Sequence, residues 1–366
     1  MLEPINQEET HALSEFGFPI IFEADWLTNN RSSNFFIEGG NIRKLRLCGK
    51  FHTPLKNQLN LSKILPLISK MPALQELEII RFDLINSVVI TLNLPSIFRL
   101  KIINCDIEED SLAWISELTS LTDLELNLNG IISLPDFFRN FSQLRSLNIA
   151  DNCIEIFPEQ IKSLKSLRQL SIEGNKLTEI PEWLGELSQL EVLNLQHNQI
   201  RELPESIGRI EKLKTLELSS NQLQSLPISI CTLPNLEVLQ IYNNQLESMP
   251  LILWEKLPKK SEFSLNKWKF PPWEIIHSSL EKILEYLRSY TPDVFLHNVE
   301  TKLQSGTPLA REETHYPEIL RLGAQLEDLC KKYPDSPTTK ELQAILNECG
   351  YVGNPRHPHA DTGILL

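Results

Sequence analysis

The chain has 366 residues, 41% of them hydrophobic, and its 48 acidic side chains outnumber 35 basic ones, which gives a formal charge of −13. This length and apolar content suffice for a long hydrophobic core. The acidic balance disfavours nonspecific binding to nucleic acid or to anionic lipid, so we expect neither nucleic acid nor a membrane as a partner.

Nothing in the sequence indicates export or membrane insertion. The first thirty residues lack the basic segment and long apolar run of a signal peptide, and no stretch has the character of a transmembrane helix. The six cysteines contain no C-x-x-C pair and are scattered at Cys48, Cys105, Cys153, Cys231, Cys330 and Cys349. This distribution favours a reducing, cytoplasmic setting, with secretion by a signal-free route as the alternative.

The N-terminal part shows a repeating pattern in a weakened form. Residues 1–40 are interpreted as an N-terminal cap, followed by a strand at Ile42, Leu45 and Leu47 and by a helix in "NLSKILPLISKMP". Two further copies start at Leu74 and Ile97, and they carry Phe82 and Cys105 where later copies carry Asn.

From Leu121 onward the frame L-x-x-L-x-L-x-x-N-x-[LI]-x-x-[LIFM]-P returns every 23 residues. Each copy has one asparagine at the same position, and we call this set the Asn column: Asn129, Asn152, Asn175, Asn198, Asn221 and Asn244. A proline follows each asparagine six residues later, at Pro135, Pro158, Pro181, Pro204, Pro227 and Pro250. A period of this length indicates a solenoid in which each copy forms one coil, and we assign residues 41–272 to it.

The geometry of one coil explains the residue types. Leu190, Leu193 and Leu195 alternate with polar residues, which predicts a short strand with its leucines pointing inward. The apolar spacing after Pro204 predicts a helical or 3₁₀ turn on the convex side. The Asn column is interpreted as structural, with each amide satisfying backbone groups of the bend. A single coil buries too little apolar surface to offset its ordering entropy, so stacking must supply the difference.

The solenoid is expected to end in a helical cap. The frame recurs one residue early at Phe263, Asn266, Trp268 and Pro272. Residues 273–290 then form an amphipathic pattern that predicts a C-terminal capping helix. Trp254, Trp268 and Trp273 are assigned to the core rather than to a ligand site.

Beyond this cap the repeat stops. Residues 291–350 are interpreted as a helical appendage, with helices in "YPEILRLGAQLEDLCKKY" and "SPTTKELQAILNECG". Residues 351–366, rich in Pro, Gly and His, are predicted to be disordered.

From Leu121 to Pro272 the sequence resembles the intracellular class of leucine-rich repeat proteins, which includes Ras-binding scaffolds, Scribble-type polarity proteins and many bacterial proteins. The segment "NKWKFPPWEIIHSSLEKILEYLRS" is similar to the cap that precedes the GTPase domain of Roco proteins. The resemblance implies an α/β horseshoe with a parallel concave sheet and short convex helical or 3₁₀ segments. It also implies that the concave sheet binds a protein. It does not extend beyond about residue 290, so the helical C-terminal appendage is predicted from its own sequence pattern.

Enzymatic alternatives have weak support in the sequence. No G-x-x-x-x-G-K-[ST] phosphate loop follows the Roco-like cap, which argues against nucleotide hydrolysis. Some bacterial effectors attach a cysteine ubiquitin ligase to such repeats, but neither Cys330 nor Cys349 lies in a C-x-D arrangement. His357, His359 and Asp361 lack a fourth ligand and a rigid support, so we predict no metal site there. We also predict that the chain has no cofactor and no catalytic residue.

The partner-binding surface is predicted near the C-terminal end of the concave face. Outward strand positions there combine one aromatic residue, two valines and several amides, as protein hot spots do. The predicted residues are Val192, Asn194, Gln196, His197, Val238, Gln240 and Tyr242. The leading interpretation is a monomeric, non-enzymatic scaffold that binds a protein. The alternatives are a regulator of a small GTPase or phosphatase, a structural role, or an effector enzyme with activity in the C-terminal region.

Overall fold

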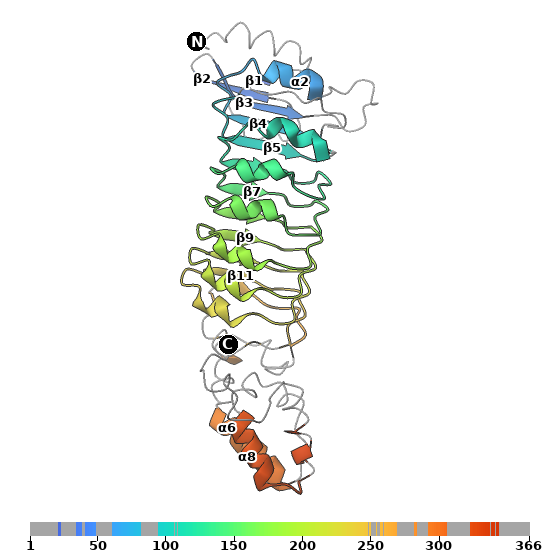
Figure 1. The fold of residues 1–366 in the computed structure, drawn as a ribbon, viewed down its shortest axis with the longest axis vertical. Helices are drawn as coiled ribbons and strands as arrows, with labels where there is room; N and C mark the ends of the chain where they lie inside the picture. Colours follow the sequence, from blue (N-terminus) through green and yellow to red (C-terminus); the bar gives the residue numbers. More distant parts are fainter. Residues whose placement is uncertain are drawn as a thin grey trace.

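A single sheet dominates the computed structural model of the chain (Figure 1). The structure describes residues 21–22, 34–38, 41–48, 61–81, 94–105, 107, 109–247, 249, 254, 257–258, 260–268, 282–283, 292–305, 323–336, 338–340 and 342–343. Within these ranges, twelve strands lie side by side in chain order, from β1 to β12. Strands β3 to β12 pair in parallel, whereas β2 runs antiparallel to β3.

The strands are short, and from β6 onward each has three residues. Their bounds are β1 Ile21–Phe22, β2 Asn34–Glu38, β3 Asn41–Cys48, β4 Glu76–Ile80, β5 Arg99–Ile103, β6 Asp123–Glu125, β7 Ser146–Asn148, β8 Gln169–Ser171, β9 Val192–Asn194, β10 Thr215–Glu217, β11 Val238–Gln240 and β12 Lys260–Glu262. From β6 to β11 each middle leucine pairs with the middle leucine of the next strand, as Leu193 does with Leu216, and Leu239 of β11 pairs with Ser261 of β12. The 23-residue period therefore keeps the sheet in register.

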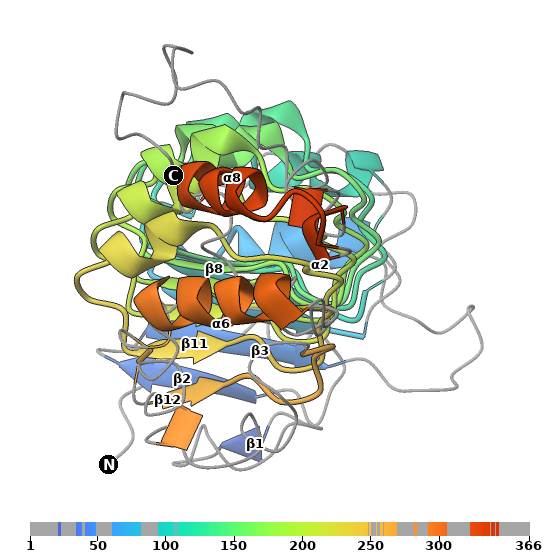
Figure 2. The same ribbon diagram turned by 90° about the horizontal axis from the view of Figure 1, so that it is seen from below.

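The return segments lie on the opposite side of each coil from the sheet (Figure 2). They are α2 Leu61–Ile68, η2 Glu109–Ile115, η3 Asp136–Asn140, η4 Glu159–Ser163, η5 Glu182–Glu186, η6 Glu205–Arg209 and η7 Ile228–Thr232. A proline of the repeat directly precedes each turn from η3 to η7 and has an extended conformation. Proline has no backbone N–H, but the 3₁₀ turn needs no hydrogen-bond donor at this position. Pro250 and Pro272 lie outside the described residues.

The core fills the space between the sheet and the return turns. Each coil contributes inward leucines or isoleucines that are almost fully buried, as Leu190, Leu193, Leu195 and Ile207 are in the coil of β9. Because these side chains also contact the coils on either side, the core is continuous along the stack. The predicted α/β solenoid is thus confirmed, including the strand at Ile42–Leu47 and the helix α2.

The C-terminal part holds a helix that the sequence pattern missed. Helices α6 Pro292–Ser305 and α8 Gly323–Lys332 lie beyond the end of the sheet (Figure 1). Helix α8 falls within a predicted helix, whereas α6 lies in the predicted helical appendage but outside its two predicted helices. Tyr333 joins the two helices, since Gln304 donates a hydrogen bond to its hydroxyl and that hydroxyl donates to Glu300.

Some predictions concern residues that the structure leaves undescribed. Most of the proposed N-terminal cap, almost all of 273–290 and the whole of 351–366 lie outside the described ranges, so these domain boundaries stay predictions. Among the helices that are described, none has the length and apolar character needed to cross a membrane.

Candidate functional site

The Asn column forms a buried ladder of hydrogen bonds along the stack. All six members are at most 8% exposed. Asn198 is typical: its amide nitrogen donates to the carbonyl oxygens of Ile172 at 2.9 Å and Leu195 at 3.1 Å, and its side-chain oxygen accepts from the Leu177 N–H at 3.0 Å. Asn266 makes the same contacts after the 22-residue step. These side chains support the fold and are not available to a partner.

Cys105 occupies the Asn column one coil before Asn129. It is fully buried, and its thiol lies 3.6 Å from the Ile79 carbonyl oxygen and 3.4 Å from that of Ile103. Its backbone N–H donates to Asn129 Oδ1 at 2.7 Å. The thiol therefore substitutes, as a weaker donor, for the missing amide. Cys105 has a structural role in this column, as a small side chain that fits the same space.

The residue before each Asn-column position has a left-handed backbone, which the sequence pattern did not reveal. The positive φ angles occur at Arg81, Asn104, Leu128, Asp151, Gly174, His197, Ser220, Asn243 and Leu265. Gly, Asn and Asp tolerate this region best, and they hold four of the nine positions. His197, a predicted binding residue, is thus held at a sharp bend, where its side chain is exposed.

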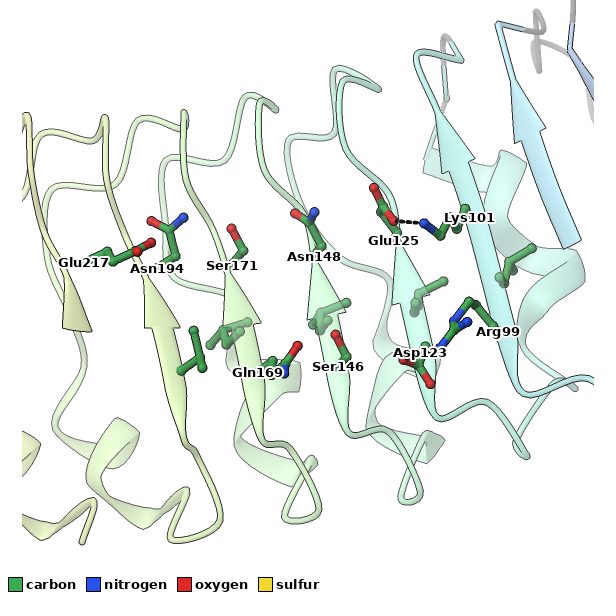
Figure 3. A pocket seen from close by; sticks show the side chains of 15 residues that line it. Arg99, Lys101, Asp123, Glu125, Ser146, Asn148, Gln169, Ser171, Asn194 and Glu217 are labelled. Atoms are coloured by element: carbon green, nitrogen blue, oxygen red, sulfur yellow. Dashed lines mark hydrogen bonds and ion pairs between the residues drawn. The ribbon is translucent and has the colours of Figure 1, made fainter. Parts of the chain in front are cut away.

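Two rows of side chains cover the concave face (Figure 3). One row comes from the first residue of successive strands and the other from the third residue, starting at β5. The first row contains Arg99, Asp123, Ser146, Gln169 and Val192. The second row contains Lys101, Glu125, Asn148, Ser171, Asn194 and Glu217. Strand register thus sets the spacing along each row, and the two rows form the surface that a bound molecule would meet.

Strands β3 to β6 carry a ladder of alternating charges, hereafter the charge ladder. In one line, Lys44 contacts Glu76 at 2.7 Å, and Arg99 lies 3.3 Å from Glu76 and 3.4 Å from Asp123. In the other, the buried Arg46 pairs with Glu78, and Lys101 lies 4.0 Å from Glu78 and 3.0 Å from Glu125. The cations of β3 and β5 are therefore neutralised by carboxylates of the neighbouring strands.

Beside this ladder the concave face is hollowed into a groove of about 400 Å³ (Figure 3). Small or neutral side chains of β7 and β8 form its floor. The residues that line it are Arg99, Leu100, Lys101, Asp123, Leu124, Glu125, Ser146, Leu147, Asn148, Gln169, Leu170, Ser171, Val192, Asn194 and Glu217. Ser146 and Ser171 leave this space open because the adjacent strands carry longer side chains.

Comparison with known families identifies the repeat. Residues 182–259 match a family model described as a leucine-rich repeat region, and residues 119–177 and 155–200 match a second model, leucine rich repeat. Residues 119–259 of the chain belong to the leucine-rich repeat family. Such arrays generally act as protein-interaction modules rather than as enzymes. No curated protein matches the sequence.

Three solved structures show similarity to the chain. A leucine-rich repeat protein of Leptospira interrogans is 28% identical, with a TM-score of 0.51 over 60% of this chain and 55% of that chain. An internalin from Listeria monocytogenes is 20% identical, with a TM-score of 0.44 over 54% of this chain and 63% of its own. The ectodomain of the Arabidopsis thaliana membrane receptor kinase GASSHO1/SCHENGEN3, solved with CASPARIAN STRIP INTEGRITY FACTOR 2, is 24% identical, with a TM-score of 0.42 over 52% of this chain and 26% of its own. This chain therefore spans less than two thirds of each.

The groove of this leucine-rich repeat protein overlaps only the edge of the predicted binding surface. Val192 and Asn194 line the groove, whereas Gln196 and His197 follow in the same coil without lining it. Val238, Gln240 and Tyr242 lie beyond the groove, in the coil of β11. Tyr242 is 36% exposed, and its strand neighbour Gln240 donates an amide hydrogen bond to the Lys260 carbonyl. The structure thus extends the candidate surface from β9–β11 back to β5.

Tryptophan side chains close the C-terminal end of the repeat core. Trp254 is fully buried, and its ring lies 5.2 Å from that of Phe263 and 5.7 Å from that of Trp268. The Trp268 indole N–H donates to the Phe263 carbonyl oxygen at 3.2 Å. Trp254 and Trp268 therefore serve packing, whereas Trp273 lies outside the described residues.

No metal centre emerges from the part of the chain that the structure describes, because no three His, Cys, Asp or Glu side chains gather suitably there. Cys330 is buried in α8. His357, His359, Asp361 and Cys349 fall outside the described ranges.

Proposed function

We propose that this leucine-rich repeat protein is a non-enzymatic scaffold whose protein partner docks on the concave face. The observation that carries the proposal is the groove over β5–β10, and the exposed Tyr242 lies beyond it toward the C-terminal coils. Its lining comes from strands whose spacing is set by the sheet and the Asn column. A rigid, preorganised surface lowers the ordering cost of binding.

The composition of this face also fits a protein partner. The face mixes paired charges, neutral amides, valines and one aromatic ring, whereas a small-molecule site would be a deep and mostly apolar pocket. The amides of Asn194 and Gln196 bond to Glu173 at 2.8 Å and Glu217 at 3.1 Å. These bonds hold the amides in place, so they present a fixed pattern of donors and acceptors to a partner.

Site-specific photo-crosslinking in cells tests the proposal. A photoreactive amino acid at Gln169, in the groove, is compared with the same group at Glu205, on the convex turn η6. We expect a specific crosslinked protein at Gln169 that is absent at Glu205, identified by mass spectrometry. Equal crosslinking at both positions, or a product at Glu205 alone, would contradict docking on the concave face.

A further inference from the structure

The charge ladder ends at β6 with its carboxylates neutralised from one side only. Glu76 lies between Lys44 and Arg99, and Glu78 lies between Arg46 and Lys101. Asp123 and Glu125 have cations only on their β5 side, because the next strand offers Ser146 and Asn148 in the same rows. The position where the next cation of the ladder would stand, over Ser146 and Asn148, therefore lies within the groove.

The other end of the groove carries carboxylates that have no cationic partner in the described part of the chain. Glu217 accepts a hydrogen bond from the Gln196 amide at 3.1 Å, and Glu173 accepts one from the Asn194 amide at 2.8 Å. These donors are neutral, and among the described residues no cationic side chain pairs with either carboxylate. Hydrogen bonds from the side-chain amides orient the carboxylates, but a neutral donor leaves the negative charge uncompensated.

The groove is therefore a neutral, hydrogen-bonding floor with carboxylates at both ends: Asp123 and Glu125, which share one end with Arg99 and Lys101, and Glu217 at the other. We infer that it receives an extended basic segment of the partner protein, with one Lys or Arg beside Asp123 and Glu125 and a second beside Glu217. This inference rests on the proposed function, because it specifies the chemistry of the partner at the same face. The neutral side chains of β7 and β8 would contact the polar residues between the two cations.

The geometry sets the spacing of these cations. Glu125 and Glu217 lie in the same row, four strands apart. At about 4.8 Å between strands, this separation is about 19 Å. An extended chain covers about 3.3 Å per residue, so two basic residues about six positions apart would reach both ends. A segment that crosses the strands can therefore place its cations beside the carboxylates at the two ends.

A defined peptide tests the inference on the full-length protein. The probe is a Ser/Gly/Gln peptide of about twelve residues, with two lysines about six positions apart and an uncharged fluorescent label, and binding is measured by fluorescence anisotropy. Control peptides carry glutamate in place of lysine, or place the two lysines next to each other. We expect the spaced-lysine peptide to bind more tightly than both, with an affinity that falls as salt is raised.

Matched protein variants separate a specific site from general attraction to an acidic protein. Glu125→Gln combined with Glu217→Gln should weaken binding of the spaced-lysine peptide roughly tenfold. Glu182→Gln combined with Glu205→Gln removes the same charge from the exposed convex turns and should leave binding within about twofold. Circular dichroism of both variants checks that the fold is intact.

The possible outcomes separate this inference from the proposed function. Equal weakening by both pairs of substitutions, or equal binding of all three peptides, would overturn the inference. If Gln169 crosslinks a partner while the spaced-lysine peptide shows no preference, concave docking stands and the basic segment is wrong. If neither the crosslink nor peptide binding is seen, both fail.

Discussion

The side-chain oxygen of Asn198 accepts a hydrogen bond from the backbone N–H of Leu177, 3.0 Å away in the preceding coil. The Asn198 amide nitrogen also donates to the Ile172 carbonyl of that coil at 2.9 Å. One side chain therefore satisfies backbone groups of two coils at a buried bend. The same contacts recur along the Asn column, so the stack depends on a side chain that no partner touches.

Asn198→Ala is expected to destabilise the fold, because buried donors and acceptors lose their partner at about 1 to 3 kcal/mol each. Urea unfolding followed by circular dichroism measures the change in the free energy of unfolding. Gln199→Ala, at the exposed neighbouring position, is the matched control and should behave as wild type. An unchanged midpoint for Asn198→Ala would mean that the amide does not support the bend.

Glu78→Ala is expected to cost about 3 kcal/mol, because it removes the carboxylate from the buried Arg46. The control is Glu186→Ala, which removes an exposed carboxylate that pairs with Lys162 and Lys165 on the convex side. Solvent screens that pair, so its unfolding midpoint should stay within error of wild type. Equal effects of the two substitutions in urea unfolding would show that the charge ladder contributes no more than surface pairs.

The ion pair between Lys214 and Glu191 predicts a pH effect. A hydrogen bond from Lys214 Nζ to Glu191 Oε2 at 2.7 Å lowers the pKa of the Glu191 carboxyl below its ordinary value. Because the folded-state pKa is lowered, this contribution to stability is present above the unfolded-state pKa and is lost as the pH falls through the folded-state pKa. Lys214→Met should raise the Glu191 pKa, which an NMR titration of the carboxyl carbon measures. An unchanged titration curve would contradict this assignment.

Tyr242→Ala is expected to weaken partner binding by at least about 1 kcal/mol while leaving the melting temperature nearly unchanged. The ring is 36% exposed, so its truncation opens no core cavity. Calorimetry with the recovered partner measures the affinity, and Glu205→Ala on η6 is the control that should change neither quantity. If the Tyr242 variant binds normally but removal of the residues after Tyr290 abolishes binding, the appendage would be the recognition surface.

Regular spacing made the architecture predictable from the sequence. Inward leucines such as Leu193 and the asparagine of each coil recur at fixed positions, so a parallel stack is the arrangement that buries them. The sequence pattern also located α2 and the early step at Asn266. It missed the left-handed position because residues as different as Leu128, His197 and Gly174 occupy it.

The functional surface was harder to predict, because it depends on pairs of residues from different coils. The neutralisation of Arg99 and Lys101 is visible only when Glu76, Glu78 and the β6 carboxylates are placed in register beside them. The groove likewise arises from small side chains between longer ones. An aromatic residue such as Tyr242 is conspicuous in a sequence, whereas a hollow over Ser146 and Ser171 is not.

The affinity of the crosslinked partner for a variant with a filled groove tests concave docking most directly. Ser171→Arg places a long side chain in the centre of the groove, whereas Glu205→Arg introduces the same residue on the convex turn η6. We predict at least roughly tenfold weaker binding by the Ser171 variant and wild-type affinity for the Glu205 variant, with both proteins folded. Wild-type affinity of the Ser171 variant would contradict docking on the concave face.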